Sequence, residues 1–257
     1  MAILNDTVPV YFPSEDQVIS KYIDLTKFLS LLSKKSLFFC RLDKLEDQFE
    51  GMTAKRNYDY RIRWYQETNH LMDTPLNDEE IVAQVEEMYE FDKKVKEVYF
   101  VCCWNKADKE NAALWKIYSD FGKGIMIKSK VSNLISAFKE TPEEIRISEI
   151  RYLDYVNDLM KDGNTYFPII HKQNAYDYEG EIRLIYEIDL PQIGRIYDWS
   201  KEEIQEGKLL SVDLNILIDE IIVGPFSPKW MTDLIIDLAD KYGLKKPISK
   251  SKLSCPW

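Results

Sequence analysis

YDYEGEIRLIYE, residues 176–187, is the stretch from which we interpret the rest of the chain. Successive side chains of a strand point to opposite faces, so Glu179, Glu181 and Arg183 are expected on one face and the apolar residues between them on the other. We expect the apolar face to pack in the core and the charged face to carry chemistry. Burying two carboxylates and a guanidinium is costly unless they pair with one another or bind a cation. The spacing leaves two interpretations open, an active site and a Glu–Arg ladder of structural value.

The composition is that of a folded domain with an acidic balance. A chain of 257 residues fits one large domain or two small ones, and 45% hydrophobic with 13% aromatic residues is ample for a packed core. The chain has 44 acidic and 34 basic residues and a formal charge of -10. This average field repels a phosphate backbone and argues against non-specific binding of nucleic acid.

Cysteine usage and the N-terminal sequence predict a cytoplasmic protein. Cys40, Cys102, Cys103 and Cys255 form no CxxC pair, and the first residues lack a basic region followed by an apolar run. No apolar run approaches the roughly 20 residues that a membrane span requires. We therefore expect reduced thiols and no membrane segment.

The order of elements predicts one α+β domain with a central mixed or antiparallel sheet. After an irregular segment over 1–20, the core is expected to comprise residues 21–52 and 98–257, with 53–97 as a helical insertion. The sheet is expected to contain the strands 37–42, 98–104, 124–128 and 181–186, and a long strand is expected over 144–155. A capping box at Asn77 and Glu80 predicts the start of a second helix of the insertion.

An acidic loop follows the first predicted strand of the sheet. Asp43, Asp47 and Glu50 lie in this loop, which ends at Gly51. Site residues are often found on loops that a rigid scaffold positions. We therefore predict that these three carboxylates line the same cleft as the glutamates of the stretch 176–187.

Several well-known catalytic motifs are absent from the sequence. It contains no GxxxxGK[ST], no GxGxxG after a strand and no HExxH, and we assign no metal ligand. The two histidines, His70 and His171, are expected to be surface or structural residues. Cys102 and Cys103 lie in an apolar strand and are expected in the core. A histidine-dependent serine or cysteine triad is therefore not expected.

Four blocks of sequence resemble an uncharacterised bacterial and phage family, the domain of unknown function 2971. The resemblance covers roughly residues 22–223. The blocks, in order, are KYIDLTKFLSLLSKKSLFFCRLDKLEDQFEG, the strand ending CCW, ALWKIY with GKGIMI, and HKQNAYDYEGEIRLIY. The chain departs from the family at residues 47–49, where a proline commonly precedes the phenylalanine. The family name itself implies no chemistry.

The layout of elements also resembles the ADP-ribosyltransferase fold, in which a late strand carries Glu-x-Glu. The resemblance implies that NAD is the substrate, that Glu181 is the catalytic glutamate, and that Glu179 orients the acceptor. It also implies a set of residues that hold the nucleotide: Tyr22, Arg41, Trp104, Trp115, Tyr118 and Arg183. CCWN stands where those enzymes usually have a serine-containing motif. The implied function is an NAD-dependent ADP-ribosyltransferase or NAD glycohydrolase, acting as a bacterial or phage toxin or defence effector on an unidentified acceptor.

Two other classes of function stay open. The first is a metal-dependent phosphodiesterase or nuclease, whose magnesium would be bound by carboxylates of the acidic loop and of the Glu-x-Glu stretch: Asp43, Asp47, Glu50, Glu179 and Glu181. The second is a non-enzymatic sensor or partner-binding module with an interface at residues 42–51 and 58–65. The sequence does not decide the oligomeric state.

Overall fold

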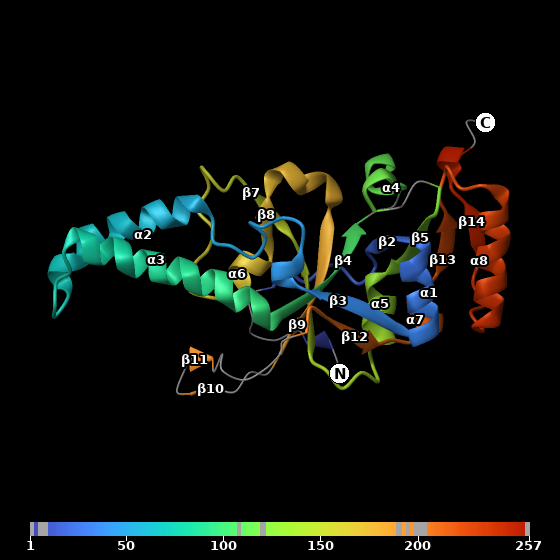
Figure 1. The fold of residues 1–257 in the computed structure, drawn as a ribbon, viewed down its shortest axis with the longest axis horizontal. Coiled ribbons are helices and arrows are strands. Elements are labelled where there is room, and N and C mark those ends of the chain that lie inside the picture. Colours follow the sequence, from blue (N-terminus) through green and yellow to red (C-terminus); the bar gives the residue numbers. More distant parts are fainter. Residues whose placement is uncertain are drawn as a thin grey trace.

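A ten-stranded, mostly antiparallel sheet forms the centre of the molecule (Figure 1). The computed structural model describes residues 3–4, 10–106, 109–118, 122–188, 192–193, 196–197 and 205–254. The strands of the sheet are β1 (Ile3–Leu4), β2 (Val18–Asp24), β3 (Ser36–Arg41), β4 (Tyr99–Lys106), β5 (Gly124–Lys130), β6 (Ile145–Glu149), β9 (Glu181–Glu187), β12 (Gly207–Ser211), β13 (Glu220–Val223) and β14 (Ile248–Lys250). They follow the order β1-β6-β9-β4-β2-β5-β13-β14, and β3 joins β12 to β4. The predicted single α+β domain and its four central strands are confirmed.

Helices and two small ribbons surround this sheet. The helices are α1 (Leu25–Lys34), α2 (Lys55–Thr68), α3 (Asp78–Val95), α4 (Ala112–Tyr118), α5 (Val131–Ala137), α6 (Tyr166–Ile169), α7 (Leu214–Leu217) and α8 (Lys229–Lys241). The 3₁₀ helices are η1 (Leu42–Lys44), η2 (Asn69–Leu71), η3 (Lys96–Val98), η4 (Asn174–Glu179) and η5 (Lys252–Ser254). The ribbons are β7 (Arg151–Leu153) with β8 (His171–Gln173), and β10 (Gln192–Ile193) with β11 (Ile196–Tyr197).

The two faces of the sheet pack against different cores. On one face, α1, α5, α7 and α8 cover the largest hydrophobic core, to which Ile182 and Leu184 of β9 belong. We name this side the apolar face. On the other face lie smaller cores around Ile185 and around Trp115 of α4. This second side also carries Glu181 and Arg183, and we name it the charged face.

Helix ends follow the capping rules that the sequence shows. Asp24 precedes α1, and its side chain accepts a hydrogen bond from the backbone nitrogen of Lys27 at 2.8 Å. Asn77 and Glu80 form the predicted reciprocal capping box at the start of α3. Both caps satisfy backbone N–H groups that the first turn of a helix leaves without partners.

α2 and α3 pack side by side into an arm that projects from the body of the molecule (Figure 1). At its base Asn57 Nδ2 donates to the carbonyl of Met160 at 2.8 Å, and Arg61 forms an ion pair with Asp162, also at 2.8 Å. These bonds connect the arm to the loop that precedes α6. The assignment of residues 53–97 as an insertion stays a prediction.

Two expectations about strands are wrong. Residues 144–155 form two short strands in different sheets, because the backbone of Ile150 donates to Glu181 whereas that of Arg151 donates to Ile170. The segment 18–20, expected to be irregular, begins β2, which pairs with β5 over its whole length. β2 thus lies inside the sheet between β4 and β5.

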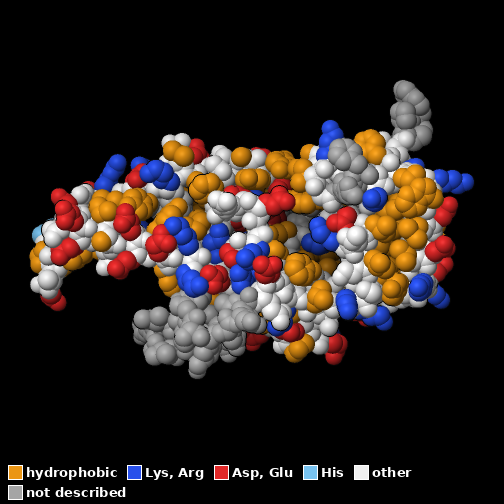
Figure 2. Space-filling model, in the orientation of Figure 1, with side chains coloured by type: hydrophobic (Ala, Val, Ile, Leu, Met, Phe, Trp, Pro, Cys, Tyr) orange, Lys and Arg blue, Asp and Glu red, His pale blue; other side chains and the backbone are white. Residues whose placement is uncertain are grey.

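The surface shown in Figure 2 is uneven in character. Charged side chains of both signs gather over the middle of the molecule, and hydrophobic side chains gather at the end that carries α8. Among the described residues, no helix combines the length and hydrophobicity needed to cross a membrane. Cys40, Cys102 and Cys103 have free thiols, and Cys255 lies outside the described residues.

Candidate active site

β9 and its neighbour β4 supply the floor of the site. In their antiparallel register Cys103 lies opposite Arg183, and Asn105 lies opposite Glu181. The predicted alternation of Glu181 and Arg183 on one face is confirmed. The charged face is buried as well as the apolar one, because Glu181 is only 2% exposed and Arg183 is fully buried.

Glu179 is not part of the strand. It ends η4, and Gly180 follows in the left-handed region at φ 50°, a conformation that glycine adopts without a steric penalty. Asn105 Nδ2 donates to the carbonyl of Glu179 at 3.0 Å, and the backbone of Lys106 donates to that of Gly180 at 2.7 Å. These bonds fix the turn, so the Glu179 side chain enters the same space as that of Glu181.

The acidic loop delivers a third carboxylate, that of Glu50. Gly51 follows at φ 75°, and a Cβ atom there would lie 2.5 Å from Leu42 Cδ2, so the loop passes too close to η1 for a larger residue. Lys96 Nζ donates to the carbonyl of Gln48 at 3.0 Å and holds the loop from the other side. The Glu50 side chain is thereby buried beside β9.

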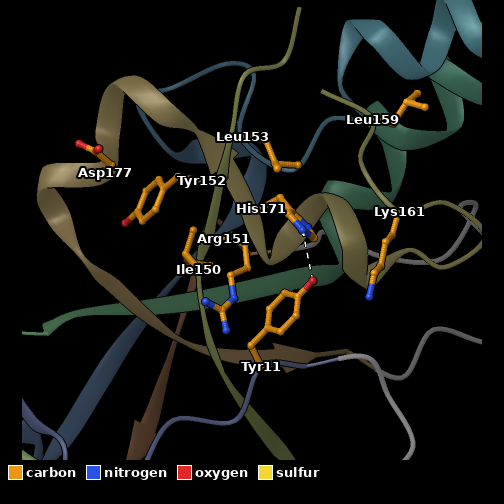
Figure 3. Close-up of a pocket in the computed structure, with 9 residues that line it drawn as sticks. All are labelled: Tyr11, Ile150, Arg151, Tyr152, Leu153, Leu159, Lys161, His171 and Asp177. Carbon is orange, nitrogen blue, oxygen red and sulfur yellow. Dashed lines mark hydrogen bonds between the residues drawn. The ribbon is translucent and has the colours of Figure 1, made fainter. Parts of the chain in front are cut away.

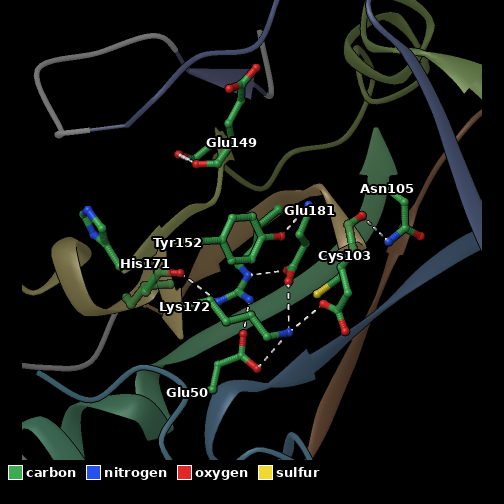
Figure 4. Close-up of polar contacts among 12 residues, drawn as sticks. Glu50, Cys103, Asn105, Glu149, Tyr152, His171, Lys172 and Glu181 are labelled. Atoms are coloured by element: carbon green, nitrogen blue, oxygen red, sulfur yellow. Dashed lines mark hydrogen bonds and ion pairs between the residues drawn. The ribbon is translucent and has the colours of Figure 1, made fainter. Parts of the chain in front are cut away.

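Ion pairs join five buried residues into what we name the charged cluster: Glu50, Glu179, Glu181, Lys172 and Arg183. Figure 4 labels Glu50, Lys172 and Glu181 of this cluster. Lys172 Nζ lies 2.7 Å from Glu179 Oε2, 3.4 Å from Glu181 Oε2 and 3.6 Å from Glu50 Oε2. Arg183 Nε lies 2.7 Å from Glu181 Oε1, and its Nη2 donates to Glu50 Oε1. Two cations therefore bridge three carboxylates in the interior.

Electrostatic interactions within the cluster set its protonation. Burial alone would raise the pKa of Glu181, but Arg183 and Lys172 outweigh it and lower that pKa to about 2. Burial raises the pKa of Glu50. For Lys172, burial acts to lower the pKa, and the carboxylates around it raise it instead. Glu181 and the two cations are therefore charged at neutral pH.

Tyrosines cover the cluster. The hydroxyl of Tyr118 donates to Glu179 Oε1 at 2.9 Å, and the backbone of Glu181 donates to the hydroxyl of Tyr152 at 2.8 Å. The ring of Tyr176 lies 4.7 Å from the ammonium group of the cluster lysine. Because Tyr118 is 39% exposed, its hydrogen bond joins the cluster to the molecular surface.

A cleft of about 480 Å³ opens beside the cluster, and we name it the α4 cleft. Its walls come from the residues around the start of α4 and from η4: Lys106, Lys109, Glu110, Asn111, Ala112, Leu114 and Tyr178. Asn111 Nδ2 donates to the carbonyl of Tyr178 at 3.3 Å and closes the cleft against η4. Glu179, the next residue of η4, belongs to the cluster, so the cleft and the cluster share this helix.

The two other acids of the predicted cleft have different positions. Asp43 binds the guanidinium of Arg41 through both oxygens, at 2.5 and 3.0 Å, so its carboxylate is paired outside the cluster. Asp47 is half-buried near the cluster, where its charge is the main cause of a raised pKa of Tyr176. The acidic loop thus contributes Glu50 directly and Asp47 at the rim.

The aromatic residues predicted to hold a nucleotide are divided between the two faces of the sheet. Trp104 lies on the apolar face opposite Ile182 and is fully buried in the main core, which overturns its predicted place in the site. Tyr22 and Trp115 pack edge to face, with ring centroids 4.9 Å apart, in a small core of their own. Tyr118 alone among these four aromatics binds a member of the cluster.

Three residues of the site were not singled out from the sequence. Asn105 was detectable, because a period of two along β4 places it on the same face as Cys103. Lys172 and Tyr152 come from the ribbon of β7 and β8, and no local pattern indicates that these short strands reach the cluster.

The Cys103 thiol also faces the cluster, but burial and the charge of Glu181 raise its pKa, which makes it a poor nucleophile.

Within the described part of the chain, no group of three or more His, Cys, Asp or Glu side chains is arranged to hold a metal ion. The three glutamates of the magnesium alternative do converge, but a lysine and an arginine occupy the positions between them. Their charge is therefore already largely matched by side chains.

Comparisons with known proteins find similarity at the level of structure only. No family model matches the sequence, so the resemblance to the domain of unknown function 2971 is not confirmed, and no curated protein matches either.

Three solved structures of DarT from Thermus sp. 2.9 are similar to the chain, each at 9% identity. The complex with NAD+ aligns with a TM-score of 0.41 and that with carba-NAD+ with 0.39, each over 94% of this chain and 98% of the other. The complex with ADP-ribosylated single-stranded DNA aligns with 0.40, over 95% of this chain and 97% of the other. Since these TM-scores are below 0.5, we transfer no residue role from DarT.

Proposed function

We propose that this protein cleaves the nicotinamide–ribose bond of NAD at the charged cluster, as an ADP-ribosyltransferase or an NAD glycohydrolase. The observation that carries the proposal is the charge of the cluster, in which three buried carboxylates face two cations. Glu181 is ionised in this cluster, because Arg183 and Lys172 lower its pKa. A buried site that holds an ionised carboxylate is suited to a substrate whose positive charge moves onto a reacting carbon nearby.

Cleavage of NAD moves the positive charge of its pyridinium ring onto the ribose. The bond between ribose C1′ and the pyridinium nitrogen breaks, its electron pair leaves with neutral nicotinamide, and the ribose becomes oxocarbenium-like. A carboxylate fixed close to that carbon stabilises the transition state more than the ground state. We assign this role to Glu181, because Arg183 and Lys172 hold it in one position and keep it ionised.

We assign the acceptor side of the reaction to Glu179. Its carboxylate accepts a hydrogen bond from the partly exposed Tyr118, so a small movement of this tyrosine would open a path from the surface. Water or an acceptor hydroxyl would then attack C1′, forming the new C–O bond and transferring its proton to Glu179. We place the entry of NAD in the α4 cleft, which shares η4 with this residue.

The proposal leaves the acceptor open. The acidic composition argues only against non-specific binding to nucleic acid and does not select an acceptor. An enzyme of this kind would act in a cell as a toxin or a defence effector, the role that the resemblance implied.

A product analysis tests this function. Purified protein is incubated with NAD, with and without EDTA, and the products are separated by chromatography. The proposal predicts release of nicotinamide that EDTA does not reduce. A metal-dependent phosphodiesterase would instead give AMP and nicotinamide mononucleotide and would need the divalent ion. Absence of nicotinamide in the presence and absence of candidate acceptors would reject the proposal.

A further inference from the structure

A second cavity, of about 610 Å³, has Asp177 of η4 in its wall, and we name it the β7 cavity (Figure 3). Its walls include Arg151 and Tyr152 of β7, His171 of β8, Tyr11 and Lys161. The size is within the range of pockets that bind small organic ligands. None of the roles assigned to the charged cluster uses this cavity.

Two cations, Arg151 and Lys161, stand in the wall of the cavity. Lys161 is exposed and forms no ion pair within the described part of the chain. Arg151 has Glu149 as its nearest carboxylate at 3.8 Å, and Lys106 holds that same carboxylate more closely at 2.7 Å. The positive charge of Arg151 and Lys161 is therefore only weakly neutralised by protein groups.

The positive charge of Lys161 and Arg151 also acts on His171, whose side chain lines the same cavity. Its Nδ1 lies 2.7 Å from the carbonyl oxygen of Phe167, which can only accept, so Nδ1 carries the hydrogen and Nε2 faces the Tyr11 hydroxyl at 3.5 Å. Burial lowers the pKa of His171, and Lys161 and Arg151 lower it further.

The acidic group of the cavity lies apart from these cations. Figure 3 shows Asp177 at the end of the cavity away from Lys161, with Tyr152 between Asp177 and Arg151. The remaining wall is formed by the apolar side chains of Ile150, Leu153 and Leu159. One end thus offers donors and positive charge, and the rest offers an aromatic ring and apolar surface.

We propose that the β7 cavity binds a nucleoside monophosphate, with its phosphate between Arg151 and Lys161 and within reach of the Tyr11 hydroxyl. Arginine and lysine are the usual partners of phosphate oxygens in proteins. The base lies against Tyr152 and the apolar wall, where a flat ring gains contact area. Asp177 excludes the reverse orientation, because it would repel the phosphate.

Calorimetric titration with AMP, adenosine and inorganic phosphate tests this site, with the full chain and without NAD. We expect AMP to bind at least tenfold more tightly than adenosine or phosphate, since only AMP satisfies both ends of the cavity. Lys161→Gln and Arg151→Gln should each weaken AMP binding about tenfold, the effect of one lost charge-assisted contact. Lys229→Gln, at an exposed position of α8 outside both cavities, is the matched control and should leave this binding unchanged.

The outcomes separate this proposal from the function proposed above. AMP binding that survives the double variant Arg151→Gln with Lys161→Gln, or that Lys229→Gln weakens as much, would overturn it, as would the absence of AMP binding at millimolar concentration. Circular dichroism of each variant confirms folding, and Lys161→Gln is at an exposed position that makes no ion pair with the residues the structure describes. Because none of these measurements uses turnover of NAD, a protein inactive on NAD can still pass them.

Discussion

The apolar and charged faces of β9 are equally closed to solvent and chemically opposite. Ile182 and Leu184 pack in the main core on one side, and Glu181 and Arg183 are bound in the charged cluster on the other. An apolar core stabilises a fold by removing apolar surface from water. A buried ion-pair network contributes little net stability, because the attraction between its charges is largely offset by the cost of desolvating them. Proteins with apolar residues in place of such a network are often at least as stable.

This difference between the two faces indicates which of them carries the function. If stability were the only requirement, the charged face could be as apolar as its opposite. We propose that the five charged side chains in the interior act on a substrate. Variants on the two faces should therefore differ in kind: those on the apolar face change stability alone, and those on the charged face also change chemistry.

The largest effect on stability is expected from Arg183→Met. This change leaves Glu181 and Glu50 with only Lys172 as a cationic partner in the interior, and removing one partner of a buried pair costs about 3–5 kcal/mol. Urea unfolding measures it. Arg63→Met, at an exposed position of α2, is the matched control and should change stability by no more than about 0.5 kcal/mol. Equal effects of both variants would mean that the cluster is not a coupled network.

Leu184→Ala tests the apolar face at the neighbouring position of the same strand. The fully buried side chain leaves a cavity in the main core, which costs about 2–5 kcal/mol. Any nicotinamide release, divided by the folded fraction at the assay temperature, should stay at the wild-type value. A loss of turnover larger than the loss of folded protein would contradict this prediction, because it would show that residues of the apolar face also affect the reaction.

Acid should reduce the contribution of the charged face to the free energy of unfolding. Because the folded-state pKa of Glu181 is about 2, below its ordinary value of 4.5, the ionised carboxylate stabilises the fold at pH values above 4.5. That contribution, of order 3 kcal/mol, is lost as the pH falls from 4.5 to about 2. Unfolding free energies across this window should fall more steeply for wild type than for Glu181→Gln. Parallel curves would contradict the assigned direction of the pKa shift.

The smallest effect is expected from Tyr118→Phe, which removes one hydrogen bond to Glu179 at the edge of the cluster. A single hydrogen bond to a charged acceptor at a partly exposed site is worth about 1 kcal/mol. Tyr178→Phe is the control, since this exposed tyrosine on the same side of the site makes no side-chain hydrogen bond among the described residues. The difference in melting temperature between the two variants measures how much this hydrogen bond stabilises the fold. Identical melting temperatures would show that the bond contributes nothing to stability.

Much of the fold follows from local patterns that were visible in the sequence. The capping box at Asn77 and Glu80 starts α3, and the apolar run of residues 98–104 forms the central strand β4. β2 escaped prediction because Ser20 and Lys21 interrupt its apolar residues, although the strand is central. The break after Ile150 was also hidden, since no glycine or proline marks the point where the chain changes its pairing partner.

The site was predictable where it depends on one strand and not where it depends on long-range contacts. Glu181 and Arg183 follow from strand alternation, and Glu50 from its place in an acidic loop. Lys172 binds all three carboxylates, but its position depends on where the separate ribbon of β7 and β8 lies, which no local pattern encodes. Trp104, which the resemblance implied for the nucleotide site, lies on the apolar face because it alternates with Cys103 and Asn105 along β4.

The most direct test of the central claim is nicotinamide release by Glu181→Gln, measured together with the melting temperature of the same preparation. Glutamine keeps the shape and removes the charge, so turnover should fall at least about 100-fold, equivalent to roughly 3 kcal/mol of transition-state stabilisation, while NAD binding is retained. Glu149→Gln, which removes an ion-paired glutamate outside the cluster, should keep its turnover. Wild-type turnover in a well-folded Glu181→Gln protein would contradict the account and leave the cluster a structural ion-pair network.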